Sequence, residues 1–195
     1  MMKFLLASNN PHKLKELNEL GLNLEAAPKD LEILENGSTF YENAKLKAQG
    51  YFEFYKKPTL ADDSGIIIEA LPDELGVASA RFGGGNLSDL EKNQLLLKKL
   101  AGNKDRKAYF ICVLCFYINS EEVFFFEGRL NGAISLEIKG ERGFGYDPVF
   151  IPEEFLGTPE SPTLAMMPDY KSKNSHRVKA LNLALQFFSK RNCQN

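Results

Sequence analysis

Two adjacent carboxylates, Asp62 and Asp63, are the residues of this chain whose placement points most directly to chemistry. They follow the apolar run 59–61 and precede Ser64 and Gly65, after which a second β-branched run begins. Neighbouring carboxylates repel each other, so one tends to keep its proton unless a cation or hydrogen bonds relieve the pair. A bound Mg²⁺ would supply that relief. A turn between two short strands, in which Asp and Ser bond their own backbone, explains the same residues without any function.

A second group of candidates lies where a predicted first strand at 3–7 meets a predicted helix. Exposed N–H groups at the start of a helix attract anions, and a lysine one turn in adds a full positive charge. The turn therefore could bind phosphate, although the same residue types also serve simply as helix caps. It consists of Ser8, Asn9, Asn10, Pro11, His12 and Lys13.

A third group lies at the start of a predicted helix over 39–55. Thr39 and Glu42 have the spacing of a capping box, in which the glutamate bonds the backbone at the helix start. Glu42 could instead act as a third carboxylate for Mg²⁺. Asn43 and Lys47 are one turn apart, so they share a helix face and could reach the same anion.

Two further segments could contact a flat or charged ligand. At 143–148, glycines on both sides of Phe144 let the backbone approach a flat group on which the ring could stack, and a tight turn is the alternative. Lys171, His176 and Arg177 gather near the predicted start of the last helix, where cations oppose the helix dipole. A bound anion or polar base would offset this, and a solvated helix start is the alternative.

Composition excludes several function classes. The 195-residue chain has a formal net charge of −2, so it lacks the basic excess of a nonspecific nucleic-acid binder. No apolar run reaches transmembrane length. The apolar run near the start of the chain is shorter than the apolar core of a signal peptide, which has about 7–15 residues. We therefore expect a soluble, cytoplasmic protein without nucleic-acid or membrane partners. Cys112 and Cys115 lie three apart on a predicted strand, which turns them to opposite faces and favours core packing over metal binding.

The apolar spacing and the caps also predict the element order. Strands and helices mix without strict alternation, which predicts an α/β fold with a mixed, partly antiparallel sheet. The segment 152–169 is proline-rich and should be irregular. The predicted strands are 3–7, 59–61, 66–68, 107–118, 122–127 and 130–138, and the predicted helices are 12–20, 39–55, 88–100 and 175–190.

Taken in order, these segments resemble the noncanonical purine nucleoside triphosphate pyrophosphatases, the inosine/xanthosine triphosphate pyrophosphatase family. The matching motifs, which also include Ser79-Ala80-Arg81, extend over essentially the whole chain. The resemblance implies a single domain over 1–195, with two lobes around a long mixed β-sheet, flanking helices and a nucleotide cleft between the lobes. It also implies a Mg²⁺-dependent homodimer that converts ITP, dITP or XTP to the monophosphate and pyrophosphate.

The resemblance assigns roles by position. Asp63 is similar to the catalytic carboxylate and Ser64 to a substrate contact, while Glu42 and Asp63 resemble the metal ligands, with Asp62 assisting. The turn from Ser8 to Lys13 resembles the triphosphate-binding site. The residues similar to those that hold the base and phosphates are Phe144, Gly145, Tyr146, Asp147, Lys171, His176 and Arg177.

Three positions depart from the family pattern, and two other functions stay open. Asn9 stands where glycine is common, Ala78 replaces an aromatic residue, and Met166 replaces a frequent glutamate. A pyrophosphatase for modified pyrimidine nucleotides would keep the carboxylates but use a different base pocket. A regulator that binds nucleotides without catalysis would not need a carboxylate that activates water, so Asp63 weighs against it.

Overall fold

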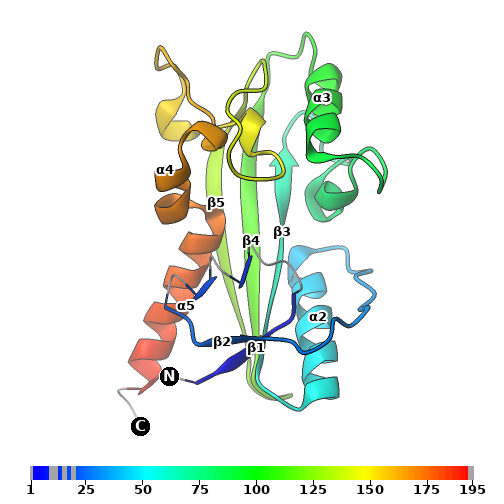
Figure 1. The fold of residues 1–195 in the computed structure, drawn as a ribbon, viewed down its shortest axis with the longest axis vertical. Helices are drawn as coiled ribbons and strands as arrows, with labels where there is room; N and C mark the ends of the chain where they lie inside the picture. The colour runs from blue at the N-terminus through cyan, green and yellow to red at the C-terminus, as the bar shows by residue number, and fades with distance from the viewer. Residues whose placement is uncertain (1, 9–12, 15–16, 19–20, 193–195) are drawn as a thin grey trace. The chain divides into compact units, whose positions relative to one another are not determined.

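The computed structural model describes residues 2–8, 13–14, 17–18 and 21–192 (Figure 1). Within this part of the chain, six strands form one sheet in the order β2-β1-β3-β4-β5-β6. β1 pairs in parallel with β2 and β3, whereas β5 and β6 pair antiparallel, so the sheet is mixed and the α/β prediction is confirmed. The strands are β1 (Phe4–Leu6), β2 (Leu24–Ala26), β3 (Thr59–Ile68), β4 (Lys107–Tyr117), β5 (Val123–Ile134) and β6 (Phe150–Pro152). The helices are α2 (Phe40–Tyr55), α3 (Asp89–Lys99), α4 (Pro168–Asn174) and α5 (His176–Asn192).

The predicted turn at the two carboxylates is wrong. β3 runs without a break through Asp62, Asp63 and Ser64, so the two predicted short strands are one. The Asp62 carboxylate does not fold back on its own backbone, because it is bound by Lys13 and Arg177, which come from distant parts of the chain. Long-range ion pairs therefore override the local preference of these residues for a turn.

Other boundaries also differ from the prediction. The predicted strands 122–127 and 130–138 are one strand, β5, which ends at Ile134. β2 and α4 were not predicted, because three and seven residues respectively are too short to show a clear apolar period. In the predicted helix 12–20, the described residues 13–14 and 17–18 are helical.

Both predicted capping boxes are present. Thr39 caps α2 and Ser88 caps α3, and in each case the glutamate three residues later, Glu42 or Glu91, bonds back to the cap residue. Each box satisfies backbone N–H groups that the helix itself leaves without partners. The starts of α2 and α3 are therefore fixed in position by local sequence.

The chain divides into two compact units, which are described separately below. Unit 1 comprises Met1–Ser64, Cys112–Gly128 and His176–Asn195, and unit 2 comprises Gly65–Ile111 and Arg129–Ser175. No helix in the described part of the chain is long and apolar enough to cross a membrane.

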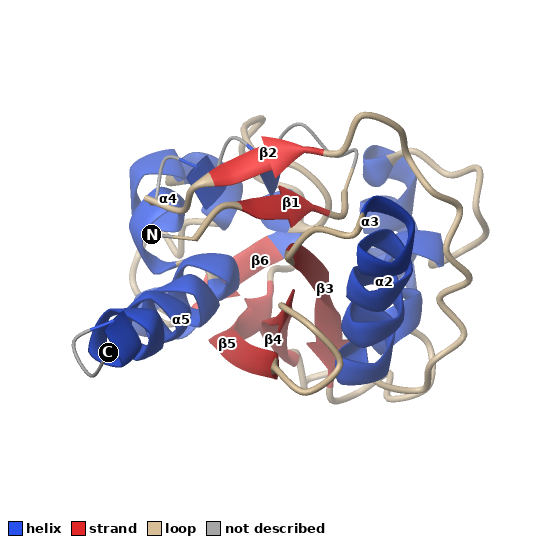
Figure 2. Ribbon diagram, turned by 90° about the horizontal axis from the view of Figure 1, so that it is seen from below, coloured by secondary structure: helices blue, strands red, loops and turns tan. Residues whose placement is uncertain are grey.

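Unit 1 packs helices against its part of the sheet. β1 and β2 lie side by side, and α2 and α5 lie on opposite sides of the strands (Figure 2). Phe4 and Phe116 meet edge to face with ring centroids 5.0 Å apart, and Leu181 of α5 joins the same core. Cys112 and Cys115 are buried without a disulfide, which confirms their prediction as core residues.

Candidate active site

Asp62 is fully buried in unit 1 and is paired with two cations. Lys13 Nζ lies 2.9 Å from Asp62 Oδ1, and Arg177 Nη2 lies 3.3 Å from Oδ2. Burial alone would raise the pKa of Asp62, but the charges of Lys13, Arg177 and Lys47 outweigh it and hold the pKa below its usual range. Asp62 is therefore an ionised group that holds Lys13 and Arg177 in place.

Asp63, the next residue of β3, is in a different environment. Successive side chains of a strand point to opposite faces, and Asp63 is partly buried where Asp62 is fully buried. Burial, followed by the carboxylates of Glu35 and Asp62, raises the pKa of Asp63 to about 6, although Lys47 opposes the shift. No described residue donates a hydrogen bond to the buried Asp63 Oδ2. Asp63 can therefore accept a proton close to neutral pH.

Lys47 links the two aspartates to a third carboxylate, Glu35. Its Nζ lies 2.9 Å from Glu35 Oε2 and donates a hydrogen bond of 3.2 Å to the Asp62 carbonyl. Burial would lower the pKa of Lys47, but Asp62 and Glu35 more than compensate and raise it, so the ammonium stays charged. Sequence reasoning missed Glu35, which lies in a polar segment before α2 with no cap or period to mark it.

A small pocket in unit 1 adjoins these groups. Its volume is about 170 Å³, and Ser8 and Lys47, which the sequence predicts as anion ligands, both line it. Tyr51 forms part of its wall, where the hydroxyl donates to Asp30 and accepts from the Leu31 amide. The lining residues are Ala7, Ser8, Asp30, Leu31, Ile33, Glu35, Lys47 and Tyr51.

Glu42 acts as the capping residue that the sequence predicts. Its Oε2 accepts from the Ser38 amide at 2.7 Å, the Ser38 hydroxyl at 2.9 Å and the Thr39 amide at 3.1 Å. The Ser38 hydroxyl and amide, more than Thr39, lower the pKa of Glu42. The predicted capping role of Glu42 is thus confirmed. The other predicted role of Glu42, as a metal ligand, stays a prediction.

Asn43 connects the segment before α2 to the catalytic candidate. Its Oδ1 accepts from the Gly37 amide at 2.8 Å, and its side chain also bonds the Asp63 carboxylate. Because Gly37 lies two residues after Glu35, Asn43 holds the Glu35 segment and Asp63 together. Asn43 thus contacts Asp63 and Lys47 the Asp62 carbonyl, while their predicted binding of one anion stays a prediction.

Arg177 and His176 are placed by the start of α5. Arg177 Nη2 donates to Ser64 Oγ at 3.2 Å, so the predicted substrate contact Ser64 belongs to the same group of side chains. A Cβ on Gly128 would lie 2.1 Å from the His176 carbonyl and 2.4 Å from the Ala180 amide. Only glycine allows α5 to begin this close to β5, and this approach brings Arg177 to Asp62.

Unit 2 holds the other predicted ligand group. The buried Asp147 accepts from the Phe144 amide at 2.9 Å and forms an ion pair with Lys171. Lys171 Nζ lies 3.9 Å from the centroid of the Phe144 ring, which is partly exposed. This segment therefore presents an aromatic face and a fixed ammonium side by side.

Some predictions lie outside the described residues. Asn9, Asn10, Pro11 and His12 of the predicted phosphate turn are among these, whereas Ser8 and Lys13 are described. Over residues 2–8, 13–14, 17–18 and 21–192, no group of three or more His, Cys, Asp or Glu side chains has the arrangement of a complete metal site.

Comparison with known proteins identifies the family. A model described as the Ham1 family matches residues 4–187. The chain belongs to the Ham1 family. A dITP/XTP pyrophosphatase of Leptospira interrogans is 45% identical over 93% of this chain and 94% of that protein, and one of Aquifex aeolicus is 40% identical over 99% and 98%. These Ham1 relatives confirm the resemblance read from the motifs.

Solved structures of Ham1 proteins agree with the fold. The Staphylococcus aureus Ham1 protein has a TM-score of 0.86 at 34% identity and covers 97% of this chain and 99% of its own. A HAM1 protein from Coxiella burnetii has a TM-score of 0.85 at 36% identity, with 97% and 100% covered. The mixed sheet with flanking helices is therefore that of the Ham1 family.

Proposed function

We propose that this protein hydrolyses the noncanonical purine nucleoside triphosphates ITP, dITP and XTP to the monophosphate and pyrophosphate, and so cleanses the nucleotide pool. Family membership and relatives named dITP/XTP pyrophosphatase support this substrate class. The observation that carries the proposal is Asp63, a partly buried carboxylate next to the ion-paired Asp62, whose pKa burial raises to about 6 although Lys47 opposes the shift. We further propose, from the family resemblance, that the protein is a cytoplasmic homodimer.

In the proposed reaction, water attacks the α-phosphorus and Asp63 takes its proton. A positioned base of this kind contributes roughly 10²–10⁴-fold in rate. Lys13, Lys47 and Arg177 would stabilise the negative charge that develops on the leaving pyrophosphate. Asp62 holds Lys13 and Arg177 in place for this task, because the neighbouring cations keep its buried carboxylate ionised.

The donor set around Asp63 fits a divalent cation. Asp63 Oδ2 is buried without a hydrogen-bond donor among the described residues, and the Glu35 carboxylate is close enough to raise the pKa of Asp63. Mg²⁺ prefers such carboxylate oxygens, and when bound it would neutralise charge on the phosphate oxygens. The sequence predicts Glu42 as the second ligand, and the structure adds Glu35 as a competitor for that role.

The proposed activity has a direct test. We expect pyrophosphate and IMP to appear in equal amounts from ITP with Mg²⁺, and we expect EDTA to abolish their release. Excess Mg²⁺ should restore it. Release of inorganic phosphate in place of pyrophosphate would contradict attack at the α-phosphorus, and nucleotide binding without turnover would indicate a regulator.

Substitution distinguishes the two candidate metal ligands. If Glu35 is the ligand, Glu35→Gln should raise the Mg²⁺ concentration for half-maximal rate by about tenfold or more, whereas Glu42→Gln should leave that concentration near wild type. Glu42→Gln should instead lower the free energy of unfolding only slightly, because it removes the charge from a capping box that glutamine can still close. The opposite pattern of Mg²⁺ dependence would restore the predicted Glu42–Asp63 pair. Mg²⁺ titration of the rate, with chemical denaturation of both variants, gives the answer.

The raised pKa of Asp63 predicts a pH profile. At limiting Mg²⁺, where Asp63 carries no metal, kcat/KM should fall as pH is lowered through about 6, because Asp63 must be ionised to accept a proton. The folded protein binds this proton more tightly than an ordinary carboxyl of pKa 3.8, so Asp63 should cost stability as pH rises from about 4 to about 6. A kcat/KM profile that stays flat from pH 5 to pH 8 would remove Asp63 as the base.

A further inference from the structure

Three consecutive residues of unit 2, Phe144, Gly145 and Tyr146, are each held by a different partner. The Phe144 amide donates to Asp147 Oδ2 at 2.9 Å, and the Tyr146 hydroxyl donates to the buried Ser79 carbonyl at 2.7 Å. Ser79 begins the Ser-Ala-Arg motif noted in the sequence, and its hydroxyl also bonds the Ile66 amide at 3.0 Å. This motif therefore anchors the segment that carries Phe144.

Gly145 is held on both sides of its backbone by α3. Its amide donates to Asp89 Oδ2 at 2.6 Å, and its carbonyl accepts from Asn93 Nδ2 at 2.9 Å. Asp89 and Asn93 are four residues apart, so they share one face of the helix. Because Asn93 is 1% exposed, its bond to Gly145 is shielded from water.

The position of this face is fixed by the start of α3. Ser88 Oγ accepts from the Glu91 amide, and Glu91 Oε2 accepts from the Ser88 amide at 2.8 Å. The capping box sets where the helix begins and thus which side chains point at Gly145. The helix is, in addition, part of the core of unit 2 through Leu96, and Leu100 directly after the helix joins the same core.

The Phe144 segment needs such support because the glycines on both sides of Phe144 restrict the backbone very little. Gly143 and Gly145 have φ values of +85° and +63°, so the ring lies between two residues with few backbone restrictions. At Gly143 a side chain is excluded, since a Cβ would lie 2.1 Å from Asp147 Oδ2. A segment that must order itself when a ligand binds loses affinity through the entropy of ordering. Holding Gly145 in advance removes part of that loss.

We propose that Asp89 and Asn93 are positioning residues that pre-order the Phe144 ring for the purine base. This inference rests on the proposed function, in which Phe144 stacks on the base. Neither residue needs to touch the nucleotide. Their effect should therefore fall on binding of the base and leave binding of the phosphates alone.

Calorimetric binding of two probes to the whole protein tests this division. Asp89→Ala should raise the Kd for IMP by about tenfold, because one charge-assisted hydrogen bond is lost. It should leave the Kd for pyrophosphate with Mg²⁺ unchanged. Asp89 is exposed, so the variant should fold. Asp89→Asn keeps an oxygen that can accept from the Gly145 amide and should restore binding of IMP. In steady-state assays, Asp89→Ala should raise KM for ITP much more than it lowers kcat.

Two comparisons complete the design. Gln94→Ala, at an exposed position of the same helix, should bind both probes as wild type does. Asn93→Ala should repeat the loss for IMP, and its melting temperature separates a fold defect from a binding defect. Equal weakening of both probes by Asp89→Ala, or no weakening of either, would overturn the inference.

The same measurements separate this inference from the proposed function. If Phe144→Leu weakens IMP binding but Asp89→Ala does not, base stacking stands and the positioning role falls. If wild-type protein fails to bind IMP, or Phe144→Leu leaves IMP binding intact, the proposed base site falls and the positioning role falls with it.

Discussion

Asp63→Asn should lower kcat for ITP by about 10²–10⁴-fold, because an amide of nearly the same shape cannot take a proton from water. The affinity for IMP should change little, since the lysine and arginine side chains assigned to the phosphates are held by other groups. Lys13 and Arg177 are held by Asp62, and Lys47 by Glu35 and the Asp62 carbonyl. Turnover and binding should thus separate in a single variant.

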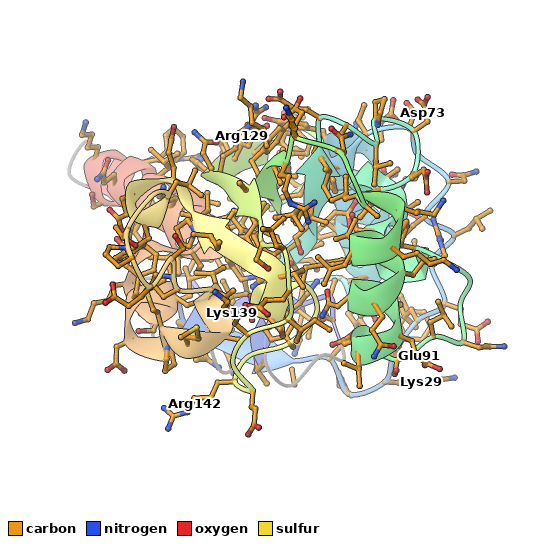
Figure 3. All side chains as sticks on the ribbon, turned by 90° about the horizontal axis from the view of Figure 1, so that it is seen from above. Lys29, Asp73, Glu91, Arg129, Lys139 and Arg142 are labelled. Carbon is orange, nitrogen blue, oxygen red and sulfur yellow. The ribbon has the colours of Figure 1, made fainter. Side chains whose placement is uncertain are left out.

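Single-turnover rates with ITP and calorimetry with IMP measure the two effects. Asp73→Asn is a matched control, because it makes the same chemical change at an exposed aspartate of unit 2 (Figure 3). It should keep the wild-type rate. Near-normal turnover by Asp63→Asn would remove Asp63 from the mechanism and leave its raised pKa as a consequence of burial and neighbouring carboxylates.

Selection of the base should be the other large effect. We expect kcat/KM for ITP and XTP to exceed that for ATP by about 10⁴–10⁵-fold. Hypoxanthine and xanthine present an O6 acceptor and an N1–H donor, whereas adenine presents the reverse. Lys171 is a donor without acceptor capacity, and Asp147 holds it beside the Phe144 ring. An ammonium fixed there can pair with O6 but not with the 6-amino group of adenine.

Rates with ITP, XTP, ATP and GTP measure this selection. Lys171→Met keeps the length of the side chain but removes the donor. It should therefore reduce the ratio of kcat/KM for ITP to kcat/KM for ATP by lowering the value for ITP. GTP shares O6 and N1–H with ITP, so its expected rejection must act on the 2-amino group and should survive in Lys171→Met. If the ratio of kcat/KM for ITP to kcat/KM for ATP is unchanged in this variant, Lys171 is excluded as the discriminating donor.

Local signals made much of the fold predictable. The capping boxes at Thr39 and Ser88 act within four residues, and both helices begin where the sequence places them. The burial of Cys112 and Cys115 follows from a long apolar run and the period of a strand. The predicted break in the strand near Asp62 was wrong because the partners of Asp62 are remote in sequence and give no local signal.

The candidate site was predictable as a set of residues but not as a set of roles. Repulsion between Asp62 and Asp63 indicates that one of them holds its proton more tightly, yet the sequence cannot say which. The answer depends on Lys13 and Arg177, which form ion pairs with Asp62. Glu35 escaped notice because its contact with Lys47 is created by folding of the segment before α2.

The unbroken course of β3 makes catalysis depend on strand alignment. β3 is aligned to β1 through Leu5 opposite Thr59 and Leu6 opposite Leu60. A single inserted or deleted residue between Leu60 and Asp62 would turn every following side chain to the other face. An insertion would move Asp62 to the position of the base, whereas a deletion would move Asp63 to the buried position among the cations. A change in the length of this strand should therefore abolish activity even though both aspartates are kept.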